Sequence, residues 1–461
     1  MKTLIIPFFL LIPIILFAQN EHAEYIEGPY KTVQEVTKGC LECHEEVAND
    51  IMHTSHWTWL GPEFETPEGK KTLGKKNMIN NFCIAVPSNW PRCTSCHIGY
   101  GWKDENFDFT KSENIDCLIC HEQTGTYKKI PTGAGMPVEG LDLLKIARSV
   151  EMPTRANCGI CHFDGGGGTG VKHGDMDDSL YHPSEELDVH MGGQDFECTE
   201  CHITEKHQIA GASHSSMAAG TNHISCDNPD CHDKDPHEKK ILNKHSDAVA
   251  CETCHIPTFA RGMPTKIWWD WSDAGKDLPG KKDEYGKPTF HKKKGSFIWK
   301  KNVKPEYAWY NGKADYYMLG DKIDPDKVVM LNKPEGDISD PKARIAPFKV
   351  MRGKQPYDPV YKYLVVPHLF GKDRFWKTFD WNASSAIGMK TVGLDYSGTV
   401  DFVETAMYWP INHTVMPAEK ALKCTQCHGW KGNKVLDWEA LGYAGDRMKR
   451  SVKKKRDYLK K

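Results

Sequence analysis

The sequence has no marked excess of charge of either sign. Its 461 residues include 60 Lys and Arg against 62 Asp and Glu, a formal net charge of −2 at pH 7. Because proteins that bind nucleic acids usually carry a basic excess, no nucleic-acid partner is expected. Beyond Asn20 the sequence also lacks an apolar run long enough to cross a membrane. We therefore expect no transmembrane helix once a signal peptide has been removed.

The long apolar run of this sequence lies at its N-terminus. Lys2 precedes an apolar stretch from Leu4 to Phe17, and Ala18 follows it. The stretch is short and interrupted by proline, which is typical of a secretory signal peptide and not of a spanning helix. We assign residues 1–18 to a signal peptide, with an N-terminal membrane anchor as the alternative. The mature protein should then be exported, in bacteria to the periplasm.

Cysteine and histidine, by contrast, are abundant, with 17 Cys and 22 His. Sixteen cysteines form eight pairs, each followed directly by a histidine, and we number these motifs one to eight in chain order. Seven motifs read C-x-x-C-H, and motif six, CDNPDCH, has four residues between its cysteines. The motifs are Cys40, Cys43 and His44; Cys93, Cys96 and His97; Cys117, Cys120 and His121; Cys158, Cys161 and His162; Cys198, Cys201 and His202; Cys226, Cys231 and His232; Cys251, Cys254 and His255; and Cys424, Cys427 and His428. Cys83 is the one cysteine outside them.

The C-x-x-C-H pattern is the attachment signature of haem c. The two thiols form thioether bonds to the porphyrin, and the adjacent histidine ligates the iron from the proximal side. A zinc site would usually draw on a second pair of ligands at a set distance. Disulfides would not need a histidine after every second cysteine. The sequence therefore predicts eight covalently bound haem c groups, each with its iron.

The spacing of the motifs indicates how the chain is organised. Seven motifs fall between Cys40 and His255, which leaves too little apolar side chain for an ordinary core. We therefore expect a mainly α fold with extensive loops, a multihaem cytochrome c whose core is the packed haem array. The haem-rich region covers 19–262. A haem-free, aromatic-rich segment over 263–405 should form short strands and long loops packed on that core, and 406–461 carries the eighth haem and a basic tail.

Two segments between the motifs have a recognisable pattern. Residues 140–153, GLDLLKIARSVEMP, are predicted to form a helix that ends at Pro153, with Lys145 on the side opposite Leu143 and Ile146. Residues 163–175, FDGGGGTGVKHGD, form a glycine-rich loop without the G-K-[ST] ending of a phosphate loop. We interpret its glycines as allowing close approach of the backbone to a haem.

Five strings along the chain point to a known family. They are NNFC before motif two, TGTYKKIPTGAG after motif three, NCGICHFDGGGG with VKHGD and DVHM around motif four, VACETCHIPTFARG at motif seven and NHTVMPAEKALKCTQCHGW at motif eight. In their order and spacing they resemble the octahaem tetrathionate reductases, over nearly all of the mature chain. The resemblance implies seven haems with two histidine ligands each and a catalytic haem at motif two, bound through His97.

The resemblance also implies a catalytic set around that haem. The family places a lysine on the distal side, and Lys145 is the best match, with Lys128 and Lys129 as competing assignments. Asn80 and Cys83 are expected in the same site, so the unpaired cysteine would lie beside the reacting haem.

Seven further histidines are needed as distal ligands. Fourteen histidines lie outside the motifs, and most of them fall in the haem-bearing regions. We choose His56, His173, His190, His207, His237, His245 and His413. His53, His182, His214 and His223 are kept as alternatives.

These assignments predict a periplasmic reductase. It would take electrons from a periplasmic or membrane-bound donor protein and deliver them to a small oxidised sulfur or nitrogen anion, either tetrathionate or, as alternatives, nitrite and hydroxylamine. A Cys83 thiolate could attack the sulfur–sulfur bond of tetrathionate. Two other functions stay open: a non-catalytic electron conduit, and a hydroxylamine-oxidising octahaem enzyme.

Overall fold

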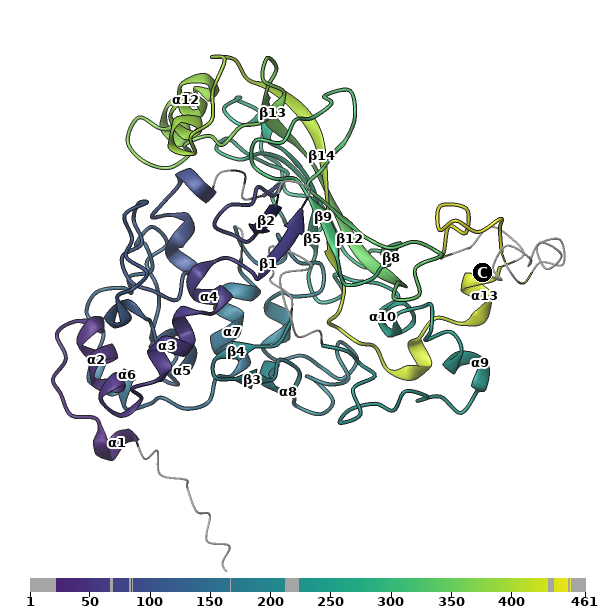
Figure 1. The fold of residues 1–461 in the computed structure, drawn as a ribbon, viewed down its shortest axis with the longest axis horizontal. Helices are drawn as coiled ribbons and strands as arrows, with labels where there is room; N and C mark the ends of the chain where they lie inside the picture. The colour runs from purple at the N-terminus through teal and green to yellow at the C-terminus, as the bar shows by residue number, and fades with distance from the viewer. Residues whose placement is uncertain are drawn as a thin grey trace, which may run out of the picture.

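The computed structural model describes residues 22–66, 69–82, 84, 86–165, 167–211, 224–429, 435–446 and 448. The predicted signal peptide, Cys83, His214, His223 and most of the basic tail lie outside these residues. Figure 1 shows a region of short helices and loops next to a tall, twisted sheet, with α12 at the top of the sheet.

The haem-rich region is built from short helices joined by long loops. The helices are α1 (His22–Tyr25), α2 (Val33–Cys43), α3 (Val47–Met52), α4 (Ser55–Thr58), α5 (Leu118–His121), α6 (Leu143–Ala147), α7 (Arg155–His162), α8 (Cys198–Cys201), α9 (Lys240–Asn243) and α10 (Cys251–His255). The 11-residue α2 begins at a capping box between Thr32 and Glu35 and buries Val33 and Val36. Among the residues described, no helix is both long and apolar enough to span a bilayer.

Most of the cysteine motifs occupy single helical turns. Motifs three, four and seven lie at least in part in α5, α7 and α10, motif five in α8, and motif eight in α13 (Cys424–Cys427). Motif two forms the 3₁₀ turn η2 (Cys93–Cys96). Residues three apart share one side of a helical turn, so both cysteines of a motif face the same way. Apart from α2 and α7, the helices that carry a motif span only four or five residues.

The haem-free segment folds as a single eight-stranded sheet. Its strands are β5 (Thr265–Asp270), β6 (Phe290–His291), β7 (Gly295–Lys300), β8 (Glu306–Tyr310), β10 (Val329–Met330), β12 (Arg344–Asp358), β13 (Tyr363–Leu364) and β14 (Asp401–Pro410). The order is β10-β14-β12-β5-β7-β6, with β8 and β13 also paired to β12. Separate two-stranded pairs join β1 (Glu63–Thr66) to β2 (Gly69–Thr72), β3 (Thr204–Glu205) to β4 (Gln208–Ile209), and β9 (Ala314–Tyr316) to β11 (Asn332–Pro334).

The central strand β12 is buried on both faces. It runs antiparallel to β14 from Phe348↔Pro410 to Tyr357↔Asp401 and parallel to β5. Side chains alternate between the faces of a strand: Met351 enters one hydrophobic core, and Phe348 enters another. The larger core also holds α11 (Phe375–Thr378), α12 (Trp381–Thr391) and buried side chains from residues 73–84. The sheet thus packs against residues 73–84, which belong to the haem-rich region in sequence.

Two expectations about secondary structure need correction. The fold is not mainly α, because aromatic and β-branched side chains of the haem-free segment favour extended strands that pair into one sheet. The helix predicted over 140–153 shortens to the five residues of α6, whose first turn is capped by Asp142. The haem-free segment does form strands, and β14 continues past residue 405 to Pro410.

Candidate functional site

A cavity of about 3360 Å³ runs through the region of short helices. Its lining includes thiols or imidazoles from seven of the eight motifs, together with backbone and side chains of the loops between them. A domain of this size ordinarily packs its interior without large voids. The cavity therefore marks the space that the attached cofactors fill, in line with a core made of porphyrin.

Seven of the motif histidines face a second histidine across this space. The ring centroids of each pair lie 6.1–6.4 Å apart. Two imidazoles on opposite sides of one iron, each with an N–Fe bond of about 2 Å, place their rings about 6 Å apart. The pairs are His44 with His22, His121 with His207, His162 with His56, His202 with His413, His232 with His190, His255 with His237, and His428 with His245. These side chains fit a six-coordinate haem iron without rearrangement.

Hydrogen bonds at the other ring nitrogen orient many of these histidines. The Nδ1 atoms of His121, His202 and His245 lie 2.7–2.8 Å from main-chain carbonyl oxygens. Carboxylates hold two others: His413 Nδ1 lies 3.1 Å from Asp175 Oδ2, and His428 Nδ1 lies 2.9 Å from Asp446 Oδ1. An Nδ1–H held in this way leaves Nε2 for a metal.

The structure places six of the seven predicted distal histidines in these pairs. His207 is presented by the two-residue turn between β3 and β4, where its φ is 61°. Such a positive φ is unusual for a residue other than glycine. A histidine at this position is therefore consistent with a functional requirement for its side chain. In the part of the chain that the structure describes, the remaining predicted distal ligand, His173, faces no motif histidine, so this assignment is corrected. Its ring packs edge-on against Trp409, with centroids 5.3 Å apart.

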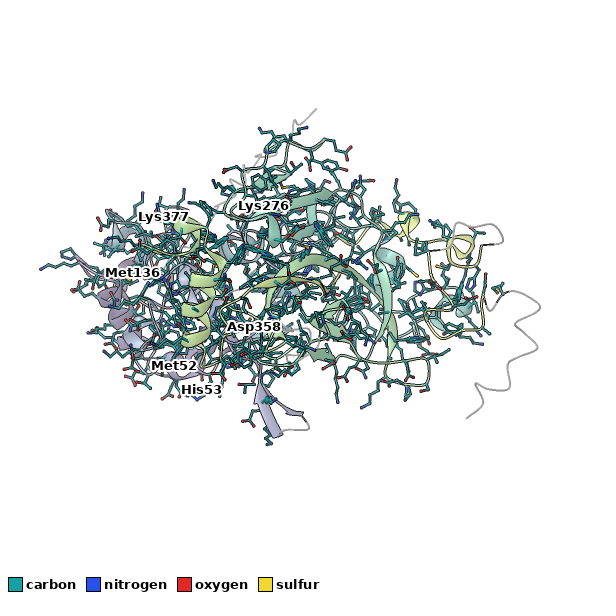
Figure 2. All side chains as sticks on the ribbon, turned by 90° about the horizontal axis from the view of Figure 1, so that it is seen from above. Met52, His53, Met136, Lys276, Asp358 and Lys377 are labelled. Carbon is teal, nitrogen blue, oxygen red and sulfur yellow. The ribbon has the colours of Figure 1, made fainter. Side chains whose placement is uncertain are left out.

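His22, which was not among the predicted distal ligands, completes the seven pairs. It lies in α1, before the first motif, and its ring faces His44. The signal in the sequence is its position, because His22 is the nearest histidine before Cys40. It lies outside the run of motifs, so the spacing of the motifs does not indicate it as a ligand. Of the alternatives within the described residues, His182 is exposed, and so is His53, which follows α3 next to Met52 at the edge of the molecule (Figure 2).

Contacts between thiols of different motifs give the order of the sites in space. Four pairs of thiols from different motifs lie close enough to shift each other's pKa: Cys40 and Cys117, Cys96 and Cys161, Cys158 and Cys198, and Cys226 and Cys251. Weaker electrostatic effects on pKa connect Cys120 with Cys158, Cys201 with Cys231, and Cys254 with Cys427. Motifs one, three, four, five, six, seven and eight therefore form a continuous line. Motif two joins that line as a branch at motif four.

His97, in the branching motif, has surroundings unlike those of the other motif histidines. Its ring is fully buried, and its Nε2 donates to the Trp57 carbonyl at 2.6 Å. The nitrogen that the paired histidines leave for a metal is therefore occupied here, and ligation of a haem iron by His97 would require its ring to turn. Aromatic rings surround it, with centroids 4.8–6.1 Å away; they belong to Trp57, Trp59, Trp102, Phe107 and Phe109. Burial lowers the pKa of His97 to about 3. Within the described part of the chain, no histidine ring faces His97 at the spacing of the seven pairs.

The segment that carries Asn80 is fastened to the sheet. Gln355 Nε2 donates to the Asn80 carbonyl at 3.3 Å, and Asn81 Nδ2 donates to the Met351 carbonyl at 2.6 Å. Trp271 Nε1 donates to the Asn81 carbonyl at 3.1 Å. Asn80 is buried, and its Oδ1 accepts from the Phe82 amide at 3.2 Å. Cys83 lies outside the described residues, but the residues on both sides of it are held in the core.

The structure does not bring the predicted lysines to the distal side of motif two. Lys145 is exposed on α6, and Lys128 is exposed as well. Lys129 Nζ forms an ion pair with Asp116 Oδ2 at 2.9 Å and donates to the His97 carbonyl. The assignment of Lys145 therefore needs correction, because a side chain on the solvent face of a helix cannot serve a buried site.

A different lysine, Lys172, is buried near this motif. Its side chain is shielded from solvent, and its Nζ lies 5.7 Å from the Phe82 ring centroid and 5.9 Å from that of Trp409. The pKa of the Cys96 thiol lies well below its usual range, chiefly because of a hydrogen bond with Cys161. Smaller contributions to this lowering come from the charges of Lys75, Lys129 and Lys172. Sequence reasoning missed Lys172, although VKHGD was among the family-like strings, because the glycine-rich loop was interpreted only through its backbone.

The glycine-rich loop does require glycine where it passes motif four. A Cβ on Gly165 would lie 2.8 Å from the Cys161 carbonyl oxygen and 3.5 Å from Lys172 Nζ. At Gly170 φ is +69°, and a Cβ would lie 2.6 Å from the Pro264 carbonyl oxygen. Both contacts are too close for another residue, so the loop can turn Lys172 toward motif two while it packs on β5.

Three comparisons place the chain among known proteins. The family model "Cytochrome c bacterial" matches residues 266–431, which span most of the sheet and motif eight. The crystal structure of octaheme cytochrome c from Shewanella oneidensis is similar with a TM-score of 0.87 and 52% sequence identity, over 93% of this chain and 98% of that chain. An uncharacterised protein of Archaeoglobus fulgidus is 26% identical over 243 residues, which are 42% of this chain and 81% of that protein.

Proposed function

The chain belongs to the octahaem c-type cytochromes, and on that premise we propose that it is a reductase whose reacting site lies at motif two. The prediction of covalently bound haem c, made from the cysteine motifs, is confirmed by this membership. The observation that carries the proposal is an asymmetry among the described residues: seven motif histidines face a partner histidine, and His97 does not.

Haem c, when bound, supplies one-electron transfer and, where one axial ligand is weak, a place for a small molecule. The seven histidine pairs close both axial positions at their sites and suit relay alone. The neighbouring thiols from motif one to motif eight support a continuous path, with motif two as its outlet. Residues around His97 then decide what the protein reacts with.

Lys172 is the residue we assign to the distal side of motif two, in place of Lys145. The family resemblance calls for a lysine there, and Lys172 is a buried lysine close to Cys96. A metal would bind the amine of Lys172 in its neutral form. An amine ligand held by a loop can yield to an incoming anion more readily than a histidine fixed through Nδ1.

Cys83 and Asn80 complete the proposed site. A Cys83 thiolate would attack the central sulfur–sulfur bond of tetrathionate, forming a bond from Cys83 Sγ to one sulfur and expelling thiosulfate. Two electrons from the relay would then cleave the new S–S bond, releasing the second thiosulfate and restoring the thiolate. Phe82 and Ile84, the neighbours of Cys83 in sequence, are buried. Nitrite and hydroxylamine are the alternative substrates.

A second function, electron conduction without catalysis, is favoured by the same continuous line of sites. Electron paramagnetic resonance of the purified holoprotein separates the two functions. The reductase should show one signal that is not bis-histidine and that responds to substrate. Viologen-coupled assays should be run in parallel with tetrathionate, nitrite, hydroxylamine and sulfite. Eight bis-histidine signals, together with no turnover of any of the four substrates, would support electron conduction without catalysis.

The proposed cellular setting follows from the cofactor and the N-terminal sequence. We place the protein in the periplasm, with a periplasmic or membrane-bound electron-donor protein as its partner. Residues 1–18, the proposed signal peptide, lie outside the described residues. Fractionation of cells that express the full chain tests the location, because haem-stained protein should appear in the periplasmic fraction.

A further inference from the structure

Two lysines lie buried in neighbouring strands of the sheet. Lys349, in β12, has no exposed side-chain surface, and Lys266, in β5, is 3% exposed. An ammonium group removed from water must find partners, or its burial is strongly unfavourable. The partners of these two lysines differ, and the difference bears on the reacting site.

Lys349 finds its partners in the loop that carries Lys172. Its Nζ donates to the Lys172 carbonyl at 2.8 Å, to the Val171 carbonyl at 3.2 Å and to Thr265 Oγ1 at 2.7 Å. A lysine ammonium has three donor hydrogens, so these acceptors use all of them. The sheet and the loop are thereby joined through a single fully satisfied group.

Thr265 extends this contact to the neighbouring carbonyls. Its Oγ1 lies 2.8 Å from the Gly170 carbonyl oxygen and 3.0 Å from that of His173. Four consecutive carbonyls, from Gly170 to His173, are therefore directed at Lys349 and Thr265. The backbone of the loop is fixed at each residue around Lys172.

We propose that Lys349 is a positioning residue for the reacting site, which sets the place of the Lys172 amine by holding the carbonyls of Val171 and Lys172. This inference rests on the proposed function, since it matters only if Lys172 serves motif two. Lys349 comes from the haem-free segment, so the sheet contributes to haem chemistry without carrying a haem. Removing its ammonium would leave buried carbonyls without donors and let the loop shift.

Lys266 offers a matched control. Its Nζ lies 3.4 Å from the Phe297 ring centroid, 3.7 Å from Trp269 and 4.9 Å from Trp299. These are cation–π contacts inside the sheet. The variant Lys266→Met therefore removes a buried lysine of the same sheet without taking a donor from the loop carbonyls.

The experiment compares Lys349→Met, Thr265→Val, Lys266→Met and Lys172→Met as holoproteins. The readouts are the non-bis-histidine paramagnetic signal, its midpoint potential, and kcat and KM with viologen and tetrathionate. We expect Lys349→Met to shift the signal and lower kcat/KM by about ten- to a hundredfold, the scale of a small misplacement in an active site. Thr265→Val should change both in the same direction and by less, and Lys266→Met should match the parent protein.

Each outcome bears on a defined statement. If Lys172→Met alters the signal while Lys349→Met and Thr265→Val leave signal and kinetics unchanged, the positioning role is overturned and the proposed function stands. If Lys172→Met itself leaves the signal unchanged, the proposed function fails, and the inference falls with it. If Lys349→Met does not yield folded holoprotein, Thr265→Val decides, because it keeps the buried ammonium and removes one of its contacts.

Discussion

The helical region and the sheet region bury their interiors in different ways. The helical region surrounds a cavity of about 3360 Å³ with thiols and imidazoles, and its helices last one to three turns. The sheet region packs aromatic and aliphatic side chains against each other, around Trp269, Met351 and Phe375. The helical region therefore encloses space for cofactors, whereas the sheet region has a hydrophobic core made of its own side chains.

This difference bears on the composition of the proposed reacting site. The seven histidine pairs lie in the helical region or its C-terminal return, where main-chain carbonyls or carboxylates hold Nδ1 of five of these histidines. The groups around motif two depend instead on the sheet: Gln355 and Met351 hold residues 80 and 81, and Lys349 holds the loop of Lys172. The paired sites thus draw their histidines from the helical region and the C-terminal return, whereas the proposed reacting site also depends on strands of the sheet.

Removal of the cofactors should have the largest effect, because it should unfold the helical region and leave the sheet region folded. Protein produced without haem attachment should lose protection from hydrogen exchange across 22–262, since the porphyrins form that core. The strands between Thr265 and Pro410 should keep slowly exchanging amides, because their ladder needs no cofactor. Hydrogen exchange read by mass spectrometry checks this region by region. Equal loss of protection in both regions would show that the sheet also depends on haem.

Replacement of Cys83 by serine should abolish turnover of tetrathionate and leave the haem absorption spectrum unchanged. Serine keeps the size of the side chain but is not ionised at neutral pH, so it cannot attack the sulfur–sulfur bond. Stopped-flow reoxidation of the reduced protein by tetrathionate measures the effect, with nitrite as the comparison substrate. Tetrathionate turnover at the parental rate would remove the thiol from the mechanism.

Replacement of His22 should affect one relay site only. His22 faces His44 at 6.2 Å between ring centroids, so His22→Ala should leave that iron without its second histidine. One of the seven bis-histidine signals should be lost and replaced by a high-spin signal, with a smaller effect on turnover than that of Cys83→Ser. His173→Ala is the control, and it should retain all seven signals. The reverse pattern would restore His173 as a distal ligand.

The smallest expected effect concerns the hydrogen bond at the eighth motif. Asp446 Oδ1 lies 2.9 Å from His428 Nδ1, and a carboxylate there makes the imidazole a stronger donor to iron. Asp446→Asn should therefore raise the midpoint potential of that haem, by an amount on the order of tens of millivolts. Asp437→Asn, which removes a carboxylate that accepts from the Glu439 and Ala440 amides, should leave the potential unchanged. Potentiometric titration distinguishes the two variants.

The sequence predicts cofactor attachment well because each motif is contiguous and carries its own ligand. Distal histidines such as His245 and His413 could be predicted because they lie near motifs in family-like strings. His22 was missed because a distal ligand can come from any loop that folds back. Lys172 was missed for a similar reason: its position depends on Lys349, which lies far away in the sequence and in another region.

The sheet was only partly predictable. Its aromatic segments indicated strands, but the 15-residue length of β12 depends on four partner strands that meet only in the folded chain. The fastening of Asn80 and Asn81 to β12 likewise joins residues about 270 positions apart. No local pattern reports such a contact.

The central claim is that one iron site of eight has a distal ligand other than histidine, supplied by Lys172. Near-infrared magnetic circular dichroism of the fully oxidised holoprotein tests it most directly, because histidine–lysine and histidine–histidine ligation give different charge-transfer bands. We predict the intensity of seven bis-histidine haems plus one histidine–lysine band that disappears in Lys172→Met. Eight bis-histidine haems, or a histidine–lysine band that survives in Lys172→Met, would contradict it.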